Sequence, residues 1–416
     1  MTRLECLILL STCSQLVTSW IFKDYPYADL SFIEKIRHDG YPLEMYELTT
    51  EDNYILTTVR IPHGVQSKNK TGRSPVLLLH GMGGTPEMFV MLGKGRALAY
   101  NLADSGFDVW FLSSRGTELS QRHKYYDIDK DLDYWNFDFH EIAIYDIPTN
   151  IDFIMKKTGQ KVFTIGHSQG NTCYFITTSE RPEYNEKIKI GVSYAPSLRL
   201  HHMDIPFANL FVHLVEVLEA IYRLLDLREI IPFSKIGLDI SKRLCREQTY
   251  FLEFCNKVIY VIGSHESKIM DKDMAPVLTS SNIGRASARQ LFHYMQITKT
   301  GQFKQYDHGW RNNLKIYGNE TPPAYDLKKS TAPVALYYGP KDDLVSPKGA
   351  IATMKSLPNV VLFEKVDYEH FNHLDFLFGW NASELVYQKT IQLFKDFDNG
   401  ILPSYNPQAE KCQEKD

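Results

Sequence analysis

Short apolar runs alternate with segments of helical spacing from residue 75 onward. Each run is nearly continuous in apolar residues and ends in turn residues, as strands buried on both faces of a parallel sheet do. The first four runs are VLLLHG (76–81), FDVWFL (107–112), KVFTIG (161–166) and KIGVSYA (189–195). Residues 140–159 carry apolar side chains at helical spacing and predict a helix that stops at Gly159. The alternation predicts βαβ units and an α/β fold with a mostly parallel sheet.

This pattern is interrupted by a helical segment near residues 198–320. Strand character then returns in APVALYY (332–338) and NVVLFEKV (359–366). An insertion of helices inside a resumed sheet favours a helical cap over a site. Its longest helix, predicted within residues 207–227, has an apolar stripe and a polar side opposite. The stripe is Phe211, Leu214, Val215, Leu218, Tyr222 and Leu225, and the polar side is His213, Glu216, Glu219 and Arg223.

The two ends of the chain differ from this body. One arginine precedes a short apolar run that ends near residue 17, which is typical of a secretory signal peptide. About 14 apolar residues are too few to span a bilayer. We therefore expect a signal peptide (1–19), a first core part (20–197), a cap or lid (198–320), a second core part (321–400) and a polar tail (401–416).

Composition narrows the classes of function. Of the 416 residues, 44% are hydrophobic and 13% aromatic, which is enough for a sizeable core, and the net charge is −4. That charge gives no electrostatic footprint for nucleic acid. Sequons for N-glycosylation begin at Asn69, Asn319 and Asn381 and fit a secretory route. Cys173 falls in a predicted helix, and we expect it to be a buried free thiol.

The pentapeptide GHSQG places Ser168 between a predicted strand, 161–165, and a predicted helix, 171–180. The G-x-S-x-G pattern alone is weak evidence, because glycine and serine are common residues. A serine on a strained turn between strand and helix is, however, the arrangement of a nucleophile. Gly166 and Gly170 would allow backbone segments to approach closely there.

A serine nucleophile needs a base and an orienting carboxylate, in the chain order Ser, Asp or Glu, His. GPKDDLVSP follows strand 332–338, and DYEHFNHLDF follows strand 359–366. We prefer Asp342 to Asp343 as the carboxylate, and His373 to His370 as the base. Asp375 is then expected to order the loop.

The oxyanion of such a reaction needs backbone N–H donors. The residue after the nucleophile, Gln169, supplies one donor, and we place the second at Met82 in the loop HGMGG (80–84). No GK[ST] follows that loop, no G-x-G-x-x-G follows a strand, and no His/Cys cluster has metal spacing. We therefore expect neither a metal nor a dinucleotide cofactor.

Several long segments resemble the acid lipase family, which includes gastric and lysosomal acid lipases. They are GYPLEMYELTTEDNYILTTVRIPHG (40–64), FDVWFLSSRG, the GHSQG region, FHYMQITKTGQFKQYDHG and FNHLDF. The resemblance implies an α/β-hydrolase fold with a cap. It implies the triad Ser168, Asp342 and His373 with the N–H groups of Met82 and Gln169, and a cap disulfide matching Cys245 and Cys255. Gly83 and Gly84 depart from the family's bulkier loop, and would loosen the second donor or enlarge the acyl pocket.

The function implied is hydrolysis of neutral lipid esters, triacylglycerols or cholesteryl esters, at a lipid–water interface. The enzyme would be secreted or lysosomal. A shorter-chain carboxylesterase or a wax-ester hydrolase would carry the same residues. A non-catalytic lipid carrier would be expected to lack part of the triad. The sequence leaves the oligomeric state open.

Overall fold

The computed structural model describes residues 30–65, 71–200, 203, 212–230, 234–237, 240, 267–270 and 284–401. The expected signal peptide, Asn69, the cysteine pair Cys245 and Cys255, and all but the first residue of the polar tail lie outside these ranges. No helix in the described ranges combines the length and apolar character needed to cross a membrane.

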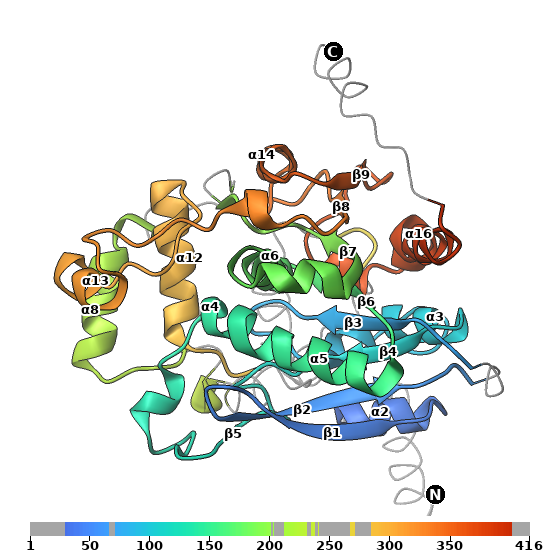
Figure 1. The fold of residues 1–416 in the computed structure, drawn as a ribbon, viewed down its shortest axis with the longest axis horizontal. Helices are drawn as coiled ribbons and strands as arrows, with labels where there is room; N and C mark the ends of the chain where they lie inside the picture. Colours follow the sequence, from blue (N-terminus) through green and yellow to red (C-terminus); the bar gives the residue numbers. More distant parts are fainter. Residues whose placement is uncertain are drawn as a thin grey trace, which may run out of the picture.

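A nine-stranded sheet runs through the described residues in the order β1-β2-β4-β3-β6-β7-β8-β9, with β5 beside β2 (Figure 1). Its strands are β1 (Glu44–Thr49), β2 (Tyr54–Ile61), β3 (Pro75–Leu79), β4 (Asp108–Phe111), β5 (Arg122–His123), β6 (Val162–His167), β7 (Ile188–Tyr194), β8 (Val334–Tyr338) and β9 (Val360–Lys365).

Neighbouring strands pair in parallel through β4, β3, β6, β7, β8 and β9, which confirms the predicted α/β sheet. All six runs named from the apolar pattern form strands. The antiparallel strands β1 and β2 precede the region in which the pattern predicted strands. Asn53 has a φ of 74° in the turn between them, a conformation that asparagine tolerates better than most residues.

Helices cover both faces of the sheet, as the contacts of two residues of β7 show. A Cβ placed on Gly191 would lie 2.5 Å from the Tyr174 ring of α6 (Gln169–Glu180). Three residues later, the Tyr194 hydroxyl contacts Thr390 of α16 (Gln388–Asp398) at 2.7 Å. Residues an odd number apart on a strand point to opposite faces. The sheet is therefore the middle layer of three.

The helix predicted at 140–159 is present in three joined parts. They are α4 (Phe139–Glu141), the π-helical segment η3 (Ile142–Asp146) and α5 (Ile147–Thr158). Pro148 lacks an N–H for the helical ladder, which explains a local change of hydrogen bonding before it. Gly159 ends the helix with a φ of 71°, as predicted.

The remaining helices connect or flank the strands. They are α2 (Phe32–His38), α3 (Leu98–Asp104), α8 (Val215–Leu224), α12 (Ala288–Thr300), α13 (Trp310–Tyr317), α14 (Pro347–Ser356) and α15 (Asp375–Phe378). Short 3-10 helices are η1 (Pro86–Phe89), η2 (Leu132–Trp135), η4 (Pro182–Lys187) and η7 (Leu327–Lys329), and η8 (Ser383–Tyr387) is a π-helical segment before α16. Figure 1 shows α8, α12 and α13 gathered at the end of the molecule away from α16.

The apolar stripe predicted for α8 is confirmed at Val215, Leu218 and Tyr222, which pack into one cluster, but it is wrong at two other positions. Phe211 lies outside the described residues. Val215 is buried, but Leu214 and Leu225 are 41% and 60% exposed. Glu219, assigned to the polar side, instead accepts a hydrogen bond from Tyr306 at 2.7 Å. The inward face of α8 therefore includes the Glu219 carboxylate, which the Tyr306 hydroxyl supplies with a hydrogen bond.

Candidate active site

Ser168 lies on the turn between β6 and α6, with φ 53° and ψ −121°. A positive φ is strained for a residue with a side chain, and such strain is concentrated at functional sites. The neighbouring glycines are required by close backbone packing. A Cβ on Gly170 would lie 2.2 Å from the Leu79 carbonyl oxygen, and one on Gly166 would lie 2.4 Å from Asn171 Oδ1. The predicted strained turn is confirmed.

Asp342 and His373 meet in the structure. His373 Nδ1 lies 2.8 Å from Asp342 Oδ2, and both side chains are buried. Asp342 Oδ1 also accepts the Val345 backbone N–H at 2.7 Å, which fixes the carboxylate. Asp342 follows β8, and His373 lies in the loop after β9. A carboxylate facing Nδ1 places the proton there, so His373 Nε2 is left as a proton acceptor.

The alternative residues of these two loops have other contacts. His370 lies 2.8 Å from Lys268 Nζ. Asp375 accepts hydrogen bonds from the Asn372 backbone N–H and from the Ser267 hydroxyl, and so orders the loop as expected. Burial raises the pKa of Asp375 to about 6.

The serine turn and the His373 loop are joined directly. His167, the residue before Ser168, donates from Nε2 to the carbonyl oxygen of His373 at 2.9 Å. β6, β7, β8 and β9 are neighbours in the sheet, so their carboxyl ends share one edge. The structure thus brings together the segments that carry Ser168, Asp342 and His373.

The loop after β3 packs against the serine. A Cβ on Gly81 would lie 3.2 Å from the Cβ of Ser168. The Gly84 N–H bonds the Gly81 carbonyl at 3.1 Å, and the Gly284 N–H bonds the Gly83 carbonyl at 3.0 Å. The glycines after Met82 are therefore held in a closed turn. Met82, a residue of this turn, is half-buried.

Two backbone N–H groups are available at this place. The amides of Met82 and Gln169 donate to no other residue in the part of the chain that the structure describes. His80 contacts the Gly81 carbonyl through Nδ1 and the Ser114 hydroxyl through Nε2, both at 2.9 Å. Burial lowers the pKa of His80 to about 4, so this anchor of the loop is uncharged at neutral pH.

Helix α12 is attached to the same region by polar contacts. The side-chain amide of Gln169 donates to Gln290 Oε1 at 2.6 Å, and the Tyr294 hydroxyl donates to Thr172 at 2.8 Å. Farther along, His293 Nδ1 lies 3.1 Å from Asp138. Burial alone would raise the pKa of Asp138, but the neighbouring His293 and Arg289 outweigh it and lower that pKa. Sequence reasoning missed these contacts.

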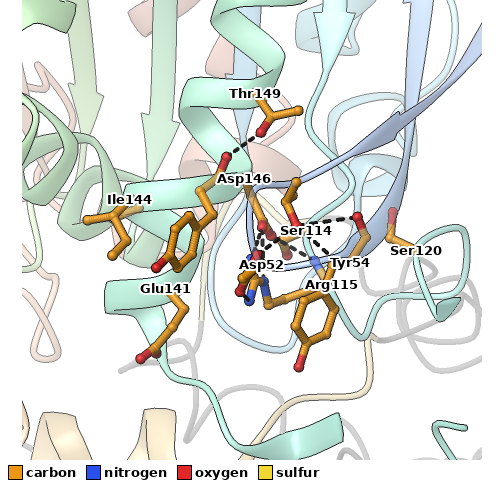
Figure 2. A network of polar contacts seen from close by, with 12 residues as sticks. Asp52, Tyr54, Ser114, Arg115, Ser120, Glu141, Ile144, Asp146 and Thr149 are labelled. Atoms are coloured by element: carbon orange, nitrogen blue, oxygen red, sulfur yellow. Dashed lines mark hydrogen bonds and ion pairs between the residues drawn. The ribbon is translucent and has the colours of Figure 1, made fainter. Parts of the chain in front are cut away.

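A buried arginine supports the loop after β4. Arg115 is fully buried and pairs with both Asp146 and Asp52, as Figure 2 shows. Its guanidinium carbon lies 3.9 Å from the centre of the Tyr54 ring. The preceding residue, Ser114, is the one that contacts His80. The sequence signal that could have indicated this buried ion pair is the arginine of FDVWFLSSRG, which follows a buried strand.

Groups of three or more His, Cys, Asp or Glu side chains arranged to hold a metal ion do not occur among the described residues. Cys173 is a buried free thiol, as expected.

Comparisons with known proteins relate the chain to lipases and to the α/β hydrolase fold. A family model described as a partial α/β-hydrolase lipase region matches residues 32–93, and one for the α/β hydrolase fold matches residues 74–377. Lipase 3 of Drosophila melanogaster is 35% identical over 366 residues, which cover 88% of this chain and 93% of that protein. Gastric triacylglycerol lipase of Mus musculus is 32% identical over 374 residues, covering 89% and 93%.

Among solved structures, an esterase from Exiguobacterium antarcticum has the same fold. It superposes with a TM-score of 0.50 at 13% identity, covering 85% of this chain and 100% of that one. The matches in sequence extend over nearly the whole length of the lipases. The chain therefore belongs to the acid lipase family of the α/β hydrolases.

Proposed function

We propose that the protein is a serine hydrolase that cleaves carboxylic esters of neutral lipids, triacylglycerols or cholesteryl esters, through an acyl-enzyme. The relatives named as triacylglycerol lipases support the substrate class. The observation that carries the proposal is the buried contact between His373 Nδ1 and Asp342, on loops joined to the strained turn of Ser168.

In the proposed mechanism, His373 Nε2 takes the proton of Ser168, whose oxygen attacks the ester carbonyl. The resulting oxyanion is bound by the amides of Met82 and Gln169. Loss of one such donor typically costs about 10²–10³ in kcat. His373 then returns the proton to the leaving alcohol, and water activated by His373 releases the fatty acid. Asp342 keeps His373 in the required tautomer and stabilises its charged form.

The cap and the secretory features belong to the same proposal. Residues 198–320 would form a helical cap or lid between core parts 20–197 and 321–400, with Cys245 bonded to Cys255. Asn319 and Asn381 are exposed, as a glycosylation acceptor must be. The enzyme would be secreted or lysosomal and would act at a lipid–water interface, without a cofactor.

The test combines labelling with turnover. Purified glycosylated protein is treated with a fluorophosphonate probe and assayed on esters from short-chain substrates to triolein and cholesteryl oleate. We expect labelling at Ser168 and preference for long, emulsified esters. Ser168→Ala should abolish both labelling and hydrolysis at an unchanged melting temperature. Ser105→Ala, at the end of α3 and outside the site, should leave both intact.

Other outcomes identify the competing functions. Labelling with a preference for short esters would indicate a carboxylesterase, and selectivity for esters of long-chain alcohols would indicate a wax-ester hydrolase. Folded wild-type protein that is never labelled would be a lipid carrier. Normal turnover by Ser168→Ala would rule out the serine mechanism.

A further inference from the structure

His167 has no part in the mechanism described above, yet it joins the turn that carries Ser168 to the loop that carries His373. Its ring lies inside the protein with 2% of the residue exposed. Nε2 lies 2.9 Å from the carbonyl oxygen of His373, and the centres of the two imidazole rings are 4.8 Å apart. The ring of Phe376, from α15, lies 6.4 Å away.

The surroundings of His167 select one tautomer. A carbonyl oxygen can only accept a hydrogen bond, so Nε2 carries the hydrogen. Nδ1 is buried and has no hydrogen-bond partner among the described residues. A proton on Nδ1 would therefore be a buried donor without an acceptor. Burial, and next the proximity of His373, lower the pKa of His167 to about 3. The ring is thus neutral at neutral pH.

This neutrality matters because His373 becomes positively charged when it takes the proton of the serine. A charged ring at the position of His167 would repel that imidazolium, whereas a neutral ring does not. At the same time, the backbone bond fixes the base relative to the residue next to the nucleophile. Misplacement by about 1 Å can cost roughly 10² in rate.

We propose that His167 is a positioning residue, whose Nε2–H holds the His373 loop against the serine turn while its ring stays uncharged beside the base. The inference rests on the proposed serine mechanism. It assigns a role to the first variable residue of GHSQG, which sequence reasoning left without one.

The test compares three substitutions at this position. Glutamine can place its side-chain N–H close to the position of histidine Nε2, asparagine is too short to do so, and leucine has no donor. The concentration of competent active sites in each preparation is determined by titrating a sample with the fluorophosphonate probe. The kcat on a soluble ester is then calculated per competent site. We expect His167→Leu and His167→Asn to lose about 10- to 100-fold in kcat, with KM changed by less than about twofold. His167→Gln should recover most of that loss.

His370→Leu is the matched control, because His370 lies in the same loop as His373 and contacts Lys268 instead. Its kcat should stay within about twofold of wild type. If His167→Leu does not fold, the comparison of glutamine with asparagine still decides. Equal kcat values for those two variants, or near wild-type kcat in His167→Leu, would overturn the proposal. Wild-type protein that is not labelled would instead overturn the serine mechanism itself.

Discussion

Two adjacent carboxylates after β8 differ in burial. Asp342 is 1% exposed and contacts His373 Nδ1 through its Oδ2 atom, whereas Asp343 is half-buried. Asp342→Asn should lower kcat by about 10³–10⁴, since an amide no longer fixes the tautomer or stabilises the imidazolium. Asp343→Asn should stay within about twofold. Turnover of a soluble ester per folded molecule measures both.

The paired design separates chemistry from loop folding. Both variants alter one residue of the same turn after β8, so a general disturbance of that turn would affect them alike. A similar loss of kcat in the two variants, or a loss below tenfold in Asp342→Asn, would contradict the role given to Asp342.

The sequence allowed individual site residues to be predicted where a local pattern and a chemical requirement point to the same position. The strand, glycine and helix around Ser168 are contiguous, and the positions of Asp342 and His373 follow from the ends of two strands. His167 and Gln290 could not be found this way. Their contacts cross 206 and 121 positions of the chain, and only tertiary packing brings such partners together.

At the scale of elements, the loop after β4 depends on one buried cation. Arg115→Met should reduce the free energy of unfolding by about 3–5 kcal/mol, because it leaves the buried carboxylate of Asp146 without its charged partner. Burial already raises the pKa of Asp146 beside Arg115. The loss should therefore shrink as pH falls and the carboxylate becomes neutral. Urea unfolding at several pH values measures it.

Arg122→Met is the control for this prediction. Arg122 likewise pairs with a carboxylate, that of Glu47 in β1. The two side chains are, however, 54% and 65% exposed. Exposed pairs contribute little, so the change should stay within about 0.5 kcal/mol. Equal losses for the two arginines, or a loss at Arg115 that grows towards acid pH, would contradict the argument.

Elements were predicted well where burial is complete and less well where it is partial. Strands such as β3, whose five residues are all buried, are recognisable as continuous apolar runs. Helix α8 has apolar residues on more than one side, and Leu214, Val217 and Leu224 are exposed. Periodicity identified Val215, Leu218 and Tyr222 as inward residues, but it could not place Glu219 beside them, because Glu219 bonds to Tyr306 of a distant segment.

At the scale of the molecule, buried titratable groups couple folding to pH. His80 and His167 are buried with pKa values lowered to about 4 and about 3. In the unfolded chain these two histidines take up protons near pH 6.5, whereas in the folded chain they stay neutral. Each histidine therefore lowers the free energy of unfolding as the pH falls below 6.5. The slope is about 1.4 kcal/mol per pH unit for each.

Asp375 opposes these histidines, because burial raises its pKa to about 6 from 3.8. Between those values the folded protein binds a proton that the unfolded chain does not, so this group adds stability as pH falls. Asp375→Asn cannot bind that proton. The stability of wild type relative to Asp375→Asn should therefore increase by about 2.4 kcal/mol between pH 7 and pH 4.

Urea unfolding of both proteins across that range tests the coupling, with Asp367→Asn as the control. Asp367 is an exposed residue of the same loop. Asp367→Asn removes a carboxylate from the surface of that loop and so controls for the change in net charge. A wild-type advantage over Asp375→Asn that is flat, or that falls towards pH 4, would mean that Asp375 is ionised in the folded protein throughout. The carboxylate would then be stabilised by its contacts with Ser267 and Asn372, despite its burial.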